Sequence, residues 1–225
     1  MDINVTYPAR YQDQEGTEKT TIRNDGRRLY MTVRGVKFEG TDFDDLRPVE
    51  MPEDSAGFTF AEYLNSDVRS LCCCAIDWQM EVPVCTGQLV APCDLRVRLV
   101  LGGQDQRTGG IDQEDLSMTL SSPFGDLKSK GTSGWFEDEL LDIQRQLPDG
   151  VFLKACINCA FSDYSPFGHD FFGSLACFRD NKEGYLKVES KRDLFDVWDT
   201  MTEFVQETYL CPDFKRRKAG AGYRG

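Results

Sequence analysis

The sequence predicts an α+β protein with a β-rich, sandwich-like N-terminal part and a smaller C-terminal part of strands and helices. Two observations support this fold class: strand patterns separated by turn signals fill residues 1–130, and helical periodicity begins only at Trp135. The chain is 40% hydrophobic and 12% aromatic, which is typical of a globular protein with a packed core. We therefore expect a β-rich part over 1–130 and an α+β part with a cysteine cluster over 131–225, as two domains or as one continuous domain.

The N-terminal part is expected to form strands joined by tight turns. The segment 3–7 alternates apolar and polar residues, and Pro8 then favours a sheet edge or a strand end, because proline has no amide proton. Asn24-Asp25-Gly26 predicts a hairpin turn, since glycine tolerates a positive φ. A later strand with one solvated face is predicted where Arg96 and Arg98 alternate with Leu95, Val97, Leu99 and Leu101.

An acidic loop holds Asp42, Asp44 and Asp45. Carboxylates in such a loop can bind Ca²⁺, but the spacing of an EF-hand loop, with its later glycine and glutamate, is missing. The sequence therefore favours a solvated acidic turn at this position.

The C-terminal part is expected to contain two helices and several strands. A helix over 135–146 is predicted to end before Pro148, and strands are predicted at 151–156, 174–179 and 185–188. A second helix over 191–209 is predicted to begin at an N-cap serine and to bury this apolar stripe: Leu194, Phe195, Trp198, Met201, Val205 and Tyr209.

Four of the nine cysteines form the strongest candidate site. Cys156 and Cys159 have the CxxC spacing that lets two thiolates hold one tetrahedral ion, and Cys177 and Cys211 could complete a four-sulfur site. Two interpretations stay open: a structural zinc ion bound by these four residues, or a cluster of buried, reduced thiols. A redox CxxC is a third alternative, although no βαβ pattern surrounds the motif.

His169 is the only histidine of the chain, and this excludes several classes of enzyme. Zinc hydrolases with several histidine ligands and HExxH proteases are excluded, and neither a nucleophile elbow nor a phosphate-binding loop occurs. We predict no catalytic or cofactor-binding residues. The rival hypothesis is an enzyme that uses the Cys156–Arg179 loop, with His169 or Asp163 as its acid or base.

Charge and hydropathy limit the partners and the compartment. The formal net charge of -12 argues against general nucleic-acid binding, because a phosphate backbone would be repelled. No apolar run approaches the ~18 residues of a membrane span. The N-terminus shows no secretory signal, so a cytoplasmic location without membrane association is expected.

These observations favour a non-enzymatic, acidic cytosolic binding protein. Its expected partner is a basic protein met through charge complementarity, which suits an immunity-type inhibitor of a basic bacterial toxin. Two alternatives remain: the enzyme described above, and a zinc-stabilised structural or regulatory module. The sequence leans away from an enzyme and names no substrate.

A longer motif contains the cysteines. Its first part is Cys156-x-x-Cys159-Ala160-Phe161-Ser162-Asp163-Tyr164-Ser165-Pro166-x-Gly168, followed by Phe172-Gly173-x-Leu175-x-Cys177-Phe178-Arg179 and by Tyr185-Leu186-Lys187-Val188. This run resembles a family of uncharacterised bacterial proteins over the last third of the chain. The resemblance implies a bacterial origin and suggests that residues 151–211 form one unit, and it implies no activity.

Overall fold

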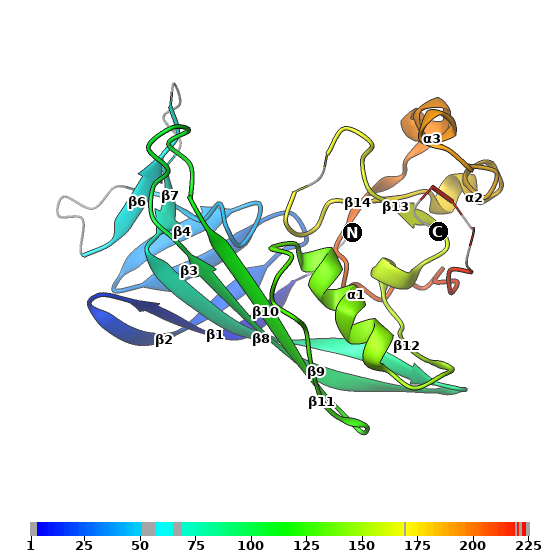
Figure 1. Ribbon diagram of the computed structural model, residues 1–225, viewed down its shortest axis with the longest axis horizontal. Helices are drawn as coiled ribbons and strands as arrows, with labels where there is room; N and C mark the ends of the chain where they lie inside the picture. The colour runs from blue at the N-terminus through cyan, green and yellow to red at the C-terminus, as the bar shows by residue number, and fades with distance from the viewer. Residues whose placement is uncertain are drawn as a thin grey trace. The chain divides into compact units, whose positions relative to one another are not determined.

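The structure is a computed structural model that describes residues 4–50, 57–64, 69–168, 170–218, 220 and 222–223. Within these residues the chain is mostly β, with a large antiparallel sheet in the N-terminal part, and with small C-terminal sheets and three helices (Figure 1). The predicted fold class is confirmed. The chain forms two compact units: unit 1 comprises Met1–Met80 and Asp94–Arg145, and unit 2 comprises Glu81–Cys93 and Gln146–Gly225.

The large sheet has the strand order β11-β10-β9-β8-β1-β2-β3-β4-β5, and β12 pairs with the distal end of β8. A separate hairpin joins β6 (Thr59–Glu62) to β7 (Arg69–Cys72). The strands of the large sheet are β1 (Val5–Asp13), β2 (Gly16–Asn24), β3 (Leu29–Val33), β4 (Val36–Gly40), β5 (Arg47–Pro48), β8 (Cys74–Thr86), β9 (Leu89–Leu101), β10 (Glu114–Ser122), β11 (Gly125–Lys128) and β12 (Val151–Leu153).

One face of the sheet in unit 1 is apolar and the other is solvated, as is common for antiparallel sheets. Along β9, the side chains of Leu95, Val97 and Leu99 are buried, whereas Arg96 is exposed and Arg98 is partly exposed. The same alternation recurs in β10, where Leu116, Met118 and Leu120 are buried. The prediction of a strand with one solvated face is therefore confirmed.

The predicted hairpin turn lies between β2 and β3, which pair in antiparallel register from Asn24 and Leu29. Gly26 has a φ of 86°, and its amide donates to Oδ1 of Asn24 at 2.8 Å. The expectation for Pro8 was wrong, because β1 is an interior strand between β8 and β2. Pairing of β1 with β8 begins only at Ala9, so the missing amide of Pro8 removes no hydrogen bond from that pair.

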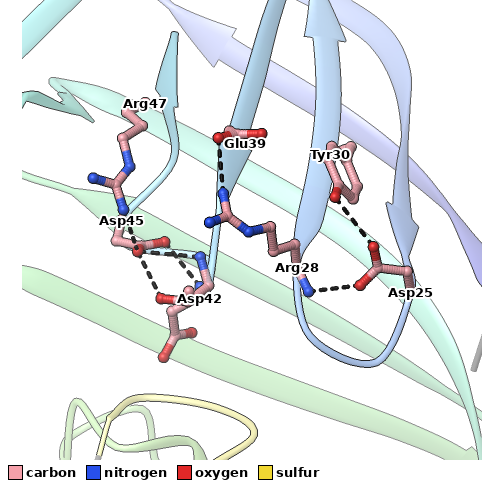
Figure 2. Close-up of polar contacts among 8 residues, drawn as sticks. Asp25, Arg28, Tyr30, Glu39, Asp42, Asp45 and Arg47 are labelled. Carbon is pink, nitrogen blue, oxygen red and sulfur yellow. Dashed lines mark hydrogen bonds and ion pairs between the residues drawn. The ribbon is translucent and has the colours of Figure 1, made fainter. Parts of the chain in front are cut away.

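Carboxylates close the loops around β3 and β4 in unit 1 (Figure 2). Asp45 accepts hydrogen bonds from the amides of Thr41 at 3.1 Å and Asp42 at 2.8 Å, and it lies 3.7 Å from Arg47. Asp42 itself is only 3% exposed, so the expectation of a solvated turn was wrong for this residue. Its Oδ1 accepts from the amide of Phe43, which makes the loop a hydrogen-bonded corner of the core.

Helix α1 (Phe136–Gln146) confirms the predicted helix over 135–146 and buries Phe136, Leu140 and Ile143. It also buries a carboxylate. Glu139 accepts hydrogen bonds from the amides of Gly131 at 2.7 Å, Thr132 at 3.0 Å and Ser133 at 2.9 Å, and from the Ser133 hydroxyl at 2.7 Å. Within unit 1, this side chain fixes the loop that leads into the helix.

Unit 2 contains a small sheet of β13 (Ser162–Asp163), β14 (Leu175–Cys177) and β15 (Glu203–Val205), together with helices α2 (Lys182–Tyr185) and α3 (Lys191–Val197). Its core is a set of buried residues to which Trp198 and Met201 add: Ala176, Phe178, Tyr185, Val188 and Leu194. The strand predicted at 185–188 was wrong, because Tyr185 ends α2.

The helix predicted over 191–209 was also wrong in its second half. It begins as expected, since the Ser190 side chain accepts from the amide of Asp193, but α3 gives way to a 3₁₀ turn at Trp198–Thr200. The Thr200 hydroxyl donates to the carbonyl oxygen of Val197 at 2.6 Å. The chain then extends and pairs as β15 with β14, which satisfies its backbone groups without a helix.

Candidate functional site

The four predicted cysteines all belong to unit 2, and all four are buried. Cys156 opens a 3₁₀ turn (Cys156–Asn158) after β12, Cys159 follows that turn, Cys177 ends β14, and Cys211 lies beyond β15. Burial raises the pKa of the Cys156 thiol, and the neighbouring Cys159, Cys211 and Cys177 raise it further. The four thiols therefore share one electrostatic environment.

Two sulfur atoms of this cluster receive backbone N–H groups from the residue two positions further along the chain. The amide of Asp213 donates to Sγ of Cys211 at 3.4 Å. Burial raises the pKa of the Cys177 thiol, while the backbone amide and the charge of Arg179 oppose that rise. Such donors stabilise a thiolate, which is the form that binds metal.

The side chains of these cysteines are not arranged as the ligands of a metal ion. Among the described residues, no group of three or more histidine, cysteine, aspartate or glutamate side chains is arranged to hold an ion. The prediction of zinc bound by Cys156, Cys159, Cys177 and Cys211 is thus neither confirmed nor contradicted, and the alternative of buried thiols stays open.

Two buried carboxylates lie in the same unit. Asp163 is 1% exposed and accepts from the Tyr185 hydroxyl at 2.8 Å, and Glu207 is fully buried and accepts from the Tyr164 hydroxyl at 3.1 Å. Arg179 instead forms an ion pair with Glu203 at 2.5 Å. Asp163 and Arg179 thus take part in different interactions, and His169 lies outside the described residues, so the acid–base hypothesis for this loop stays a prediction.

A second candidate site lies on the solvated face of the sheet in unit 1, and the sequence reasoning missed it. It is a groove with a volume of about 820 Å³ that crosses β2, β1, β8, β9, β10 and β11, which are adjacent in the sheet. Its polar lining includes Thr6, Arg10, Lys19, Thr21, Asp77, Gln79, Arg96, Arg98, Ser117, Thr119, Asp126 and Lys128. Figure 1 shows the long β8 and β9 strands, which lie in the middle of these six strands.

The charge of the groove is opposite to that of the chain. Among its described lining residues, five are basic (Arg10, Lys19, Arg96, Arg98, Lys128) and two are acidic (Asp77, Asp126), in a chain whose formal net charge is -12. Clefts lined by one sign of charge attract ligands of the opposite sign. The groove is therefore suited to an anionic ligand.

Strand register places these charges side by side. Lys19, Arg10 and Asp77 lie opposite one another on β2, β1 and β8. The Arg98 Nη1 atom donates to both carboxylate oxygens of Asp77, at 2.9 and 2.8 Å, and Arg10 Nη2 reaches the same carboxylate at 3.3 Å. One carboxylate thus holds two guanidinium groups in place.

A second set of charges lies toward the other edge of the groove. Arg96 lies opposite Thr119, which lies opposite Lys128. Arg96 Nη2 donates to Asp126 at 3.0 Å and to the Ser121 hydroxyl at 3.1 Å. The hydrogen bond from Ser121 holds the pKa of Asp126 below its usual value, with the charge of Arg96 adding to the effect. Asp126 therefore stays ionised to a lower pH than a free aspartate.

One signal in the sequence points toward the groove. The alternation of Arg96 and Arg98 with buried residues predicts two cations on one strand face. Their cationic neighbours Arg10, Lys19 and Lys128 come from strands whose pairing partners the sequence does not reveal.

A model of a family of unknown function, DUF6304, matches residues 5–162, which include every residue of the groove. The sequence resemblance to an uncharacterised family is confirmed in this general form. The motif on which it rested lies mostly beyond residue 162, outside the matched region. No helix in the described part of the chain is long and apolar enough to cross a membrane. No curated protein and no solved structure gives a match. Since the family model covers more than half of its residues, the chain belongs to DUF6304, a family of unknown function.

Proposed function

We propose that this protein is a non-enzymatic binding protein and that the groove on unit 1 binds its ligand through the ligand's anionic groups. The observation that carries the proposal is the excess of basic over acidic side chains in the groove of a strongly acidic chain. The groove provides the binding surface that composition alone did not identify.

The framework of the groove supports this role. Its volume of about 820 Å³ falls within the range of roughly 300–1,000 Å³ typical of ligand sites. The cations project from paired strands, and Arg10, Arg96 and Arg98 each contact a carboxylate of the groove, which reduces the side-chain entropy that is lost when a ligand binds. Preorganised cations of this kind favour specific recognition over loose charge attraction.

The basic partner expected from net charge requires a different surface. A basic protein would be repelled by Arg10, Lys19, Arg96, Arg98 and Lys128 in the groove. An immunity-type inhibitor of a basic toxin would therefore have to use acidic surface elsewhere on the chain. That proposal rests on net charge alone, and co-expression with a candidate toxin would test it.

We expect the double charge reversal Lys19→Glu/Arg96→Glu to weaken binding of citrate and of pyrophosphate by about tenfold or more, because it places like charges beside the ligand. Amide chemical shifts in a ¹⁵N-labelled sample at low ionic strength would report both the affinity and the location. Perturbed amides should cluster on β1, β2, β8, β9, β10 and β11.

The matched control is Arg27→Glu/Lys37→Glu, which reverses two exposed cations outside the groove, changes the net charge by the same amount and should leave the affinity unchanged. Shifts spread over the whole chain, or equal weakening by the control, would show that the anions respond only to net charge. Either outcome would remove the proposal.

A second proposal concerns unit 2: that Cys156, Cys159, Cys177 and Cys211 bind one structural Zn²⁺ ion. The burial of all four thiols and the N–H donors on Cys177 and Cys211 support it, because four thiolates are a common zinc ligand set. The present side-chain positions would have to change on binding. The ion would connect β14 to the segments before β13 and after β15.

Protein purified without added metal should then contain about one zinc per chain by elemental analysis, as expected for a single tetrahedral site. Cys156→Ser and Cys177→Ser should each lose the metal, whereas Cys85→Ser, at a buried cysteine outside the cluster, should keep it. Zinc that is absent from the wild type, or that survives both cluster substitutions, would leave buried thiols as the interpretation.

A further inference from the structure

We infer that the ligand of the groove is an acidic polypeptide segment of a partner protein, lying across the strands with its carboxylates on the arginines of β1 and β9. This inference rests on the proposed function and names the class of ligand. Three properties of the groove support it: the group that its arginines already hold, its extent, and the absence of surfaces for nucleobases.

The first property is the chemistry of the internal ion pairs. Arg98 contacts both oxygens of the Asp77 carboxylate, at 2.9 and 2.8 Å, and Arg96 contacts the Asp126 carboxylate at 3.0 Å. These guanidinium groups are thus already positioned by carboxylates. Glutamate or aspartate side chains of a ligand would present the same planar, two-oxygen group to arginines.

The second property is extent. Six adjacent strands contribute to the groove, and at a spacing of roughly 4.8 Å they span about 24 Å. An extended chain of about seven residues covers that distance at ~3.4 Å per residue. A single small anion would fill only part of such a face. The hydroxyls of Thr6, Thr21, Ser117 and Thr119 add hydrogen-bonding groups along it.

The third property separates a peptide from a single-stranded nucleic acid. Proteins bind single strands by stacking bases on exposed aromatic side chains, and the one aromatic residue among the described lining residues is Trp78, which is only 2% exposed. The net charge of -12 also repels a long polyphosphate chain beyond the groove. A short acidic peptide lies within the cationic region throughout its length.

Asp77 is a specificity-determining residue in this arrangement. It lies opposite Arg10 in the β1–β8 pair and takes hydrogen bonds from both Arg10 and Arg98. Asp77 therefore competes with a ligand carboxylate for these two guanidinium groups. In Asp77→Asn the amide oxygen still accepts a hydrogen bond and keeps an arginine positioned, but the competing negative charge is gone. Affinity for an acidic peptide should therefore rise, whereas a purely positioning role of the carboxylate predicts no gain.

The test is fluorescence anisotropy with a labelled eight-residue Glu/Gly peptide, compared with the Gln/Gly peptide of equal length and with an oligo(dT) of equal charge. We expect the acidic peptide to bind most tightly, with an affinity that falls as salt rises. Arg10→Gln/Arg96→Gln should weaken it about tenfold or more, and Asp77→Asn should strengthen it severalfold. The control Arg27→Gln/Lys37→Gln, which removes two cations outside the groove, should change nothing. Circular dichroism on each variant verifies that the fold is retained.

The outcomes separate this inference from the proposed function. If oligo(dT) binds as tightly as the peptide, or if Asp77→Asn weakens peptide binding, the peptide assignment is overturned. The anion groove then still stands if citrate and pyrophosphate perturb its strands. If no anionic probe perturbs those strands, both the inference and the proposed function fail.

Discussion

Replacement of Trp78 by alanine is expected to lower the free energy of unfolding of unit 1 by about 3–5 kcal/mol. Trp78 lies on β8 in the middle of the sheet order, is 2% exposed, and stacks on Phe43 with ring centroids 3.9 Å apart. Truncation removes this aromatic contact and leaves a cavity in a close-packed core. Denaturant titration followed by far-ultraviolet circular dichroism measures the loss.

Trp135→Ala is the matched control for this substitution. Trp135 is 45% exposed, so its truncation should cost about 1 kcal/mol or less. Equal losses for the two variants would mean that Trp78 is not part of a packed core. Because the chain has two compact units, each titration should be fitted for one and for two transitions before a value is assigned to unit 1.

Replacement of Glu139 by alanine is expected to lower the free energy of unfolding by about 3 kcal/mol or more. The buried carboxylate accepts from three successive amides, at Gly131, Thr132 and Ser133, and its removal leaves these donors unpaired. A buried donor left without a partner costs about 1–3 kcal/mol, and these amides lie on partly buried or exposed residues, so each is expected at the lower end of that range. Asp138→Asn, on an exposed neighbour in α1, should change stability far less.

The same carboxylate makes stability depend on pH. Burial raises the pKa of Glu139, but the hydrogen bonds from Ser129, Ser133 and Gly131 outweigh burial and leave the folded-state pKa below the ordinary value. Its stabilisation is therefore complete above the unfolded pKa of about 4.3, and it is lost as the pH falls through the lower folded pKa. In Glu139→Gln this part of the acid dependence should disappear, as denaturant midpoints between pH 7 and pH 3 would reveal. An unchanged pH profile would mean that Glu139 does not carry this stabilisation.

Local sequence signals predicted the elements whose stability is largely local. The helix at 136–146, the hairpin turn at 24–26 and the one solvated face of β9 all follow from patterns within a single segment. The two errors in unit 2 have different causes. Residues 203–205 fit a helical stripe but pair with β14, because tertiary pairing outweighs a weak local preference. Tyr185 ends the helical turn α2, which the Asn181 side chain caps by accepting from the Gly184 amide.

The cysteines show which parts of a site can be predicted from sequence spacing. Spacing alone makes Cys156 and Cys159 neighbours. The prediction that Cys177 and Cys211 join them depends on the fold, and in the structure all three of the other thiols act electrostatically on Cys156. Whether they bind a metal depends on the directions of four short side chains, which spacing does not specify.

The groove, in contrast to the cysteine pair, could hardly be predicted from the sequence. Alternation along a strand states which residues share a face, and it identified Arg96 and Arg98 as solvated. It does not state which strand lies beside which, because that order depends on hydrogen bonds between segments far apart in the chain. Lys19, Arg10 and Asp77 become neighbours only because β1 pairs with both β2 and β8. The sequence by itself therefore determined the fold class, whereas the cationic groove depends on strand pairing, which only the tertiary structure shows.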